Sequence, residues 1–171
     1  MASRQVSAEY LKAGEDYLAA LQKLGMRPRF LGWGWELASE RWQLVLVTSI
    51  VDAGGPLALN RLLFKAYNAE ATPKEISPFI VRVFSPEIVP GDFYLLGEKN
   101  LKYEIQEKNG KWRKPSFDDD HKIVNVEKDF FGLHLEMINA YQNLPHPKSS
   151  GYHERRSEWQ RFKRNVEKLA A

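Results

Sequence analysis

The sequence predicts an α+β fold in which helices pack on a mixed, mostly antiparallel sheet of about five or six strands. Two observations carry this prediction. Apolar residues recur at helical spacing near both ends of the chain, whereas short apolar or alternating segments separated by turn signals occupy much of the middle. With 171 residues and no internal repeat, we expect one α+β globular domain over residues 1–144. Residues 145–171 are expected to form a flexible connection and a basic C-terminal helix that docks on the domain or on a partner.

The first predicted element is an N-terminal helix that begins after Ser7 and ends at Gly25. Ser7 is a suitable N-cap, and Pro28 follows the end of the helix. The apolar stripe of this helix needs cover, which the domain or a second copy of the chain can provide. The stripe consists of Tyr10, Leu11, Tyr17, Leu18, Leu21 and Leu24.

A β-hairpin is predicted over residues 30–37 and 41–52. Because side chains alternate across a strand, Trp33 and Trp35 share one face of the first strand, and Gly32 and Gly34 share the other. The tryptophan face is interpreted as cover for a core, with an aromatic ligand platform as the alternative. The two glycines indicate that a helix, a large ring or a partner approaches the backbone closely. All four are therefore candidate binding residues.

The second strand of this hairpin contains "LVLV" and is expected in the middle of the sheet, covered on both faces. A helix is predicted to follow it, with Pro56 in its first turn. Asp52, Gly54 and Gly55 lie between the two elements, where strand ends often line a binding crevice. Asp52 is interpreted either as a carboxylate that binds a hydroxyl, an amine or a cation, or as a cap for the helix or turn. These three residues complete the set of candidate binding residues.

Residues 78–84 are predicted to form a strand that can lie parallel to the preceding one, because a helix connects them. Asn109-Gly110 predicts an exposed, lysine-rich edge hairpin. A short strand is expected at residues 122–126.

Two C-terminal helices are predicted to complete the domain. The first, over residues 127–143, is based on the spacing of Phe130, Phe131, Met137, Ile138 and Tyr141. The second, at residues 154–169, is based on Trp159, Phe162, Val166 and Leu169.

Signatures of phosphate-binding loops, nucleophilic serine turns and helical zinc-protease sites are missing from the sequence. The sequence contains one candidate metal site. Carboxylates beside an imidazole can hold a hard divalent ion, which would fit a metal-dependent hydrolase or nuclease with a dispersed carboxylate site. A polar loop explains the same residues more simply. They are Asp118, Asp119, Asp120 and His121.

The last predicted helix is strongly basic. Residues 145–171 contain seven Lys and Arg against three Glu, although the whole chain has a net charge of only +3. This pattern indicates either a nucleic-acid surface or a solvated helix face. The candidate nucleic-acid contacts are Arg155, Arg156, Arg161, Lys163 and Arg164.

The composition narrows the class of protein. The sequence has no cysteine, no signal-like N-terminus and no apolar run of the length a membrane helix needs, so we expect a cytoplasmic protein. No cofactor is expected. The favoured hypothesis is a small accessory or binding protein, not an enzyme, that acts through a protein partner. Nucleic-acid binding, dimerisation through the terminal helices and metal-dependent hydrolysis are the alternatives.

Overall fold

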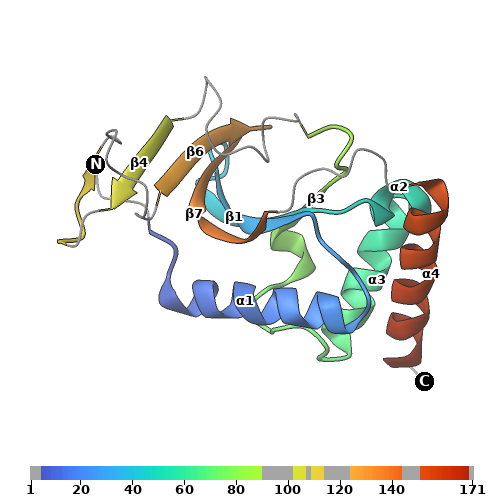
Figure 1. Cartoon of the computed structure of the whole chain (residues 1–171). Coiled ribbons are helices and arrows are strands. Elements are labelled where there is room, and N and C mark those ends of the chain that lie inside the picture. The colour runs from blue at the N-terminus through green and yellow to red at the C-terminus, as the bar shows by residue number, and fades with distance from the viewer. Residues whose placement is uncertain (1–4, 90–101, 107–108, 114–123, 144–150, 170–171) are drawn as a thin grey trace.

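The computed structural model describes residues 5–89, 102–106, 109–113, 124–143 and 151–169. Within these ranges the chain forms four α-helices, one 3-10 helix and seven strands (Figure 1). The helices are α1 (Ala8–Lys23), α2 (Ile50–Gly54), α3 (Pro56–Asn68) and α4 (Tyr152–Leu169), and the 3-10 helix is η1 (Pro78–Ile80). The strands are β1 (Phe30–Glu36), β2 (Arg41–Val47), β3 (Val81–Phe84), β4 (Lys102–Gln106), β5 (Trp112–Arg113), β6 (Val124–Phe130) and β7 (Leu133–Asn143). No helix in the described ranges is long and apolar enough to cross a membrane.

The strands form one sheet in the order β3-β2-β1-β7-β6-β4-β5. β3 is parallel to β2, whereas the other neighbouring pairs are antiparallel. The predicted α+β class with a mixed, mostly antiparallel sheet is confirmed. The β1–β2 hairpin and the β4–β5 hairpin around Gly110 also form, although β2 ends at Val47 and the short helix α2 follows it.

The predicted helix over residues 127–143 is wrong, and with it the expectation of two C-terminal helices. This segment is the β6–β7 hairpin, which reverses at Phe131 and Gly132, both with positive φ. Two consecutive residues in this conformation end a helix and form a two-residue hairpin turn. The buried side chains of Leu133 and Leu135 show the two-residue period of a strand.

Two hydrophobic clusters cover the two faces of the sheet. The larger lies between one face and the helices: α1 runs along the sheet, while α3 and α4 stand together at one end (Figure 1). Its buried members include Leu31, Trp33, Leu44 and Leu46 from the sheet, Tyr17 and Leu21 from α1, Leu63 from α3, and Phe162 and Val166 from α4. The smaller cluster, on the opposite face, joins Phe30, Val45 and Val47 to Phe130, Leu133 and Leu135. β2 is therefore covered on both faces, as its apolar sequence predicts.

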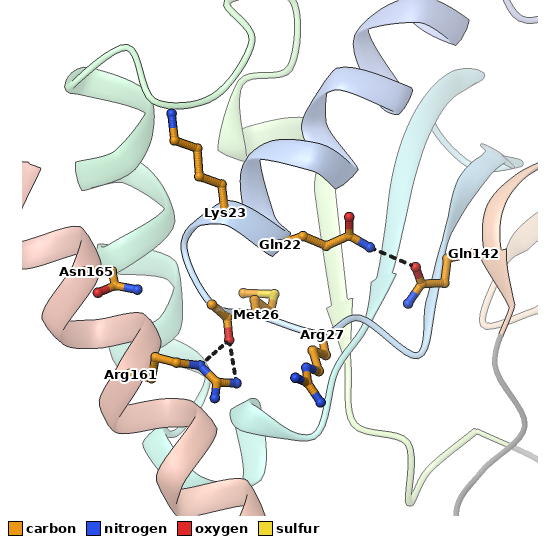
Figure 2. Close-up of a pocket in the computed structure, with 8 residues that line it drawn as sticks. Gln22, Lys23, Met26, Arg27, Gln142, Arg161 and Asn165 are labelled. Atoms are coloured by element: carbon orange, nitrogen blue, oxygen red, sulfur yellow. Dashed lines mark hydrogen bonds between the residues drawn. The ribbon is translucent and has the colours of Figure 1, made fainter.

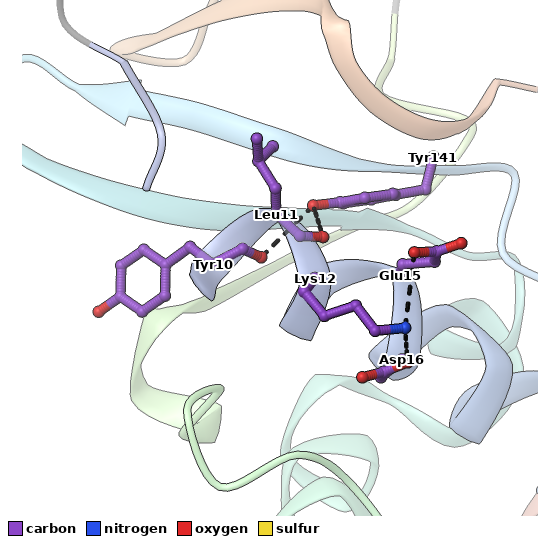
Figure 3. A network of polar contacts seen from close by, with 6 residues as sticks. All are labelled: Tyr10, Leu11, Lys12, Glu15, Asp16 and Tyr141. Carbon is purple, nitrogen blue, oxygen red and sulfur yellow. Dashed lines mark hydrogen bonds and ion pairs between the residues drawn. The ribbon is translucent and has the colours of Figure 1, made fainter. Parts of the chain in front are cut away.

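Tyr141 fastens α1 to the sheet (Figure 3). Its hydroxyl donates to the Leu11 carbonyl oxygen at 2.7 Å and accepts from the indole Nε1 of Trp33 at 2.8 Å. Tyr10 of α1 stacks on Trp33 with 4.9 Å between ring centroids. Burial raises the pKa of Tyr141, which keeps its hydroxyl protonated and able to donate. The ring lies so close to α1 that a Cβ at Gly14 would be 2.4 Å from it.

We predict that Gly14→Ala destabilises the protein, although alanine is the better helix former by about 1 kcal/mol. The added methyl group must displace the Tyr141 ring, which overpacks the junction and disturbs both hydrogen bonds. We expect a net loss of about 1–2 kcal/mol in the free energy of unfolding, measured by urea denaturation. Gly151→Ala is the control for an added methyl group without overlap, because no atom lies within 4 Å of its added Cβ and only the start of α4 is affected. A Gly14→Ala variant as stable as the native protein would contradict this account of Gly14.

Candidate functional site

The alternating tryptophans and glycines of β1 serve mainly to pack the strand against other parts of the same chain. Trp33 is completely buried under α1, and Trp35 is half-buried against the ring of Trp42. A Cβ at Gly32 would be 2.8 Å from the Phe30 ring, and one at Gly34 would be 2.7 Å from Leu135. The ring of Phe30 thus lies against Gly32, and an aliphatic side chain, Leu135 of β7, lies against Gly34.

The glycines also mark the place where the sheet bends. Between the pairs Gly32–Ala140 and Gly34–Leu135, β1 advances by two residues and β7 by five. Extra residues in one strand of an antiparallel pair form a bulge that bends and twists the sheet. Glycine permits the close backbone approach that such a bend requires.

We expect Gly34→Val to lower the free energy of unfolding by about 2 kcal/mol or more, because its side chain would overlap both Leu135 and Val45. Thermal and urea unfolding measure the loss. A variant as stable as the native protein would show that Leu135 and Val45 do not pack against β1 as described.

Asp52, Gly54 and Gly55 do come together, but α4 occupies the place expected for a ligand. Asp52 accepts a hydrogen bond from the Ser85 hydroxyl at 2.8 Å and lies 3.9 Å from the Arg155 guanidinium. A Cβ at Gly54 would be 2.3 Å from the Trp159 ring, so only glycine lets α4 pack here. Gly55 has φ +82°, and no atom lies within 4 Å of an added Cβ. Its backbone conformation, not close packing, is therefore the reason that glycine is favoured at this position. The carboxylate therefore binds a hydroxyl and a cation within the chain.

The basic residues of α4 separate into two groups. Arg155 pairs with Glu87 at 2.6 Å, and Arg161 donates from Nε and Nη2 to the Gly25 carbonyl oxygen at 3.1 and 3.0 Å. Arg156, Lys163 and Arg164 are exposed. The apolar faces of α1 and α4 are buried within the chain, through Tyr17 and Leu21 and through Trp159, Phe162 and Val166.

The candidate metal ligands Asp118, Asp119, Asp120 and His121 lie outside the described residues. Within the described part of the chain, no group of three or more His, Asp or Glu side chains is placed to hold a metal ion.

A groove of about 420 Å³ follows strand β3. We call it the β3 groove; its lining includes Val81, Arg82, Val83 and Phe84 of β3, Pro56 and Asn60 of α3, and Phe131 and Leu133 of the β6–β7 hairpin. At one end Arg82 forms an ion pair with Glu36. A hydrogen bond from Ser39, assisted by Arg82, lowers the pKa of Glu36 and keeps its carboxylate charged.

Phe131 is the least expected residue in this groove. It occupies the first position of a two-residue turn with φ +45°, although asparagine, aspartate or glycine is preferred there. Its side chain is 66% exposed and stacks on Phe84, with 5.7 Å between ring centroids. Bulky residues rarely adopt positive φ, and such strain is concentrated at functional sites. Sequence reasoning placed Phe131 in a helix; the following Gly132 was the available signal for a turn.

A second concave site lies where α4 meets the loop after α1 (Figure 2). We call it the α1–α4 cleft; it has a volume of about 700 Å³ and is lined by Gln22, Lys23, Gly25, Met26, Arg27, Gln142, Arg161 and Asn165. The loop is held by Arg161 on the Gly25 carbonyl, by Asn165 on the Leu24 carbonyl at 3.1 Å, and by Glu158.

The Glu158 carboxylate accepts the backbone N–H of Arg27 at 2.6 Å. Burial raises the pKa of Glu158 more than this hydrogen bond and the nearby guanidinium groups lower it. In the folded state Glu158 therefore holds its proton to a higher pH than in the unfolded chain.

No protein-family model, curated protein or solved structure matches the chain.

We predict that Glu158→Gln gains stability relative to the native protein as pH rises from about 4 to about 7. A carboxyl whose pKa is raised on folding stabilises the folded state below its unfolded pKa, and this contribution is lost as pH rises through the folded pKa. Glutamine keeps an acceptor for the Arg27 N–H without this titration. Urea denaturation of both proteins across the pH range measures the difference. A difference that stays constant, or that grows in favour of glutamate, would contradict the burial of this carboxyl.

Proposed function

We propose that the protein is a small binding protein that recognises an extended segment of a protein partner along strand β3. The observation that carries this proposal is the exposed, strained Phe131 beside a strand at the edge of the sheet. As part of the same proposal we place the protein in the cytoplasm, because a sequence without cysteine suits a reducing compartment.

The hydrogen bonds of β3 support an extended ligand. The Phe84 carbonyl oxygen accepts from the Thr48 N–H at 3.0 Å and so faces the β2 side. Because backbone groups alternate along a strand, the N–H and C=O of Val83 point away from β2. In the described part of the chain no strand lies beyond β3. A partner segment that pairs with Val83 would add a strand to the sheet, a common mode of peptide recognition.

The side chains of the β3 groove suggest what this segment carries. Phe84 and Phe131 offer an aromatic surface on which an apolar side chain can be buried. Arg82 is half-exposed beside Glu36, so a positive and a negative side chain lie next to the aromatic surface. Together they can form a polar rim around the bound segment. We infer a segment with apolar residues at alternate positions, because alternate side chains of a strand point to one face.

The test is selection of binders from a random peptide library displayed on phage, followed by measurement of the affinity of the enriched peptides. We predict peptides with alternating apolar residues that bind about tenfold more weakly, or worse, to Phe131→Asn and to Val83→Pro. Asparagine tolerates positive φ, and proline at position 83 removes the outward N–H of an edge strand while replacing a side chain that is only half-buried. Both variants should therefore remain folded, with Phe131→Asn within about 1 kcal/mol of the native stability.

Phe79→Asn is the matched control. Phe79 is 81% exposed and precedes β3, but it does not line the groove. Its replacement should leave peptide affinity unchanged. Two results would contradict the proposal. In the first, the peptides bind all three variants with equal affinity. In the second, they bind the native protein and Phe131→Asn but not the other two variants. A loss of more than about 2 kcal/mol in Phe131→Asn would show that Phe131 serves packing instead.

A further inference from the structure

The α1–α4 cleft is lined by cationic side chains that are not needed to pack the surrounding elements together. Three of its lining residues, Lys23, Arg27 and Arg161, are cationic, and no carboxylate lines it within the described residues. The Glu158 carboxylate lies outside the cleft but attracts the guanidinium groups of Arg27 and Arg161. No ion pair within 4.0 Å joins the side chain of Lys23 or Arg27 to a described carboxylate. The remaining polar side chains are the neutral amides of Gln22, Gln142 and Asn165. Each amide group already donates one N–H within the chain, to Gln142, to the Pro28 carbonyl or to the Leu24 carbonyl, and keeps a second N–H for a ligand.

The charge exceeds what the end of helix α1 needs. The C-terminal end of a helix carries a partial charge equivalent to about half an electron, which Lys23 in the last turn can balance. Arg161 spends two of its five N–H groups on the Gly25 carbonyl, so three remain available. The guanidinium of Arg27 is not needed to hold the loop, because the contact with Glu158 uses its backbone N–H.

We propose that the α1–α4 cleft binds a small anion that carries at least two phosphate groups. Two or more cationic side chains with amide donors between them match the several charged oxygens of a diphosphate. The volume of about 700 Å³ lies within the range of small-molecule sites. This inference goes beyond the proposed peptide-binding function, because the two sites share no residue.

The surroundings of the cleft favour a compact anion over a nucleic-acid strand. The adjoining concave surface of about 450 Å³ shares Arg27 and Arg161 with the cleft and adds Arg29. It also contains Glu154 and Glu158, which interrupt the continuous basic track that a strand needs. Arg155, which also lines that surface, is already paired with Glu87. Arg156, Lys163 and Arg164 are exposed on α4 but do not line the cleft. The cleft is thus the part of this basic region that no carboxylate lines among the described residues.

The test is isothermal titration calorimetry of the whole chain with inorganic pyrophosphate and inorganic phosphate at constant ionic strength. We expect one pyrophosphate per chain, bound more tightly than phosphate. In the double variant Lys23→Gln with Arg27→Gln, the affinity for pyrophosphate should fall by about tenfold for each cation removed. Neither side chain holds the α1 loop, and Lys23 only balances the helix dipole, so the variant should unfold within a few degrees of the native temperature.

The matched control is the double variant Arg156→Gln with Arg164→Gln, which removes the same charge from the exposed side of α4. It should bind pyrophosphate as the native protein does. No saturable binding below about 10 mM, or an equal loss in both double variants, would overturn the proposal. So would tight binding of a single-stranded oligonucleotide that depends on Arg156 and Arg164, because it would identify α4 as a nucleic-acid surface.

Discussion

The hydrogen bond from the Trp33 indole to the Tyr141 hydroxyl is the contact on which the arrangement of the layers depends. It joins β1 to β7, and the same hydroxyl continues to the Leu11 carbonyl of α1. A buried indole N–H without a partner would cost about 1–3 kcal/mol, so this network also fixes where α1 lies on the sheet. Gly14 allows the close contact. Once α1 is placed, the loop at its C-terminal end lies where Arg161 and Asn165 of α4 can donate hydrogen bonds to its carbonyl oxygens.

Sequence reasoning recovered the elements whose signals are local. The N-terminal helix and the β1–β2 hairpin follow from capping, periodicity and turn residues. The strand predicted over residues 78–84 forms only from Val81, because Pro78–Ile80 is a 3-10 helix. The segment at 127–143 failed because its apolar residues fit a helical period, while the decisive feature was a turn with phenylalanine where glycine or asparagine is preferred. The partner of Asp52 could not be predicted, since Arg155 is more than 100 residues away along the chain.

The two proposed sites differ in the physical chemistry that would drive binding. The β3 groove offers exposed aromatic surface and an outward-facing backbone, and its key residue keeps an unfavourable conformation. The α1–α4 cleft offers positive charge that a single loop and one face of α4 bring together. Neither could be recognised from sequence alone, because Lys23, Arg27 and Arg161 acquire a common role only when α4 packs beside α1. Strand β1, with its alternating tryptophans and glycines, mainly forms part of the core that positions the β3 groove and the α1–α4 cleft.

The central claim is that the outer edge of β3, beyond which no strand lies in the described ranges, can pair with a partner segment. Residue-resolved amide hydrogen exchange, followed by NMR, tests this claim most directly. The account predicts that the Val83 amide exchanges rapidly with solvent, while the amides of Arg82 and Phe84, which face β2, are protected by the sheet. Protection of Val83 equal to that of Phe84 in the unliganded protein would show that the edge is already paired and would contradict the account.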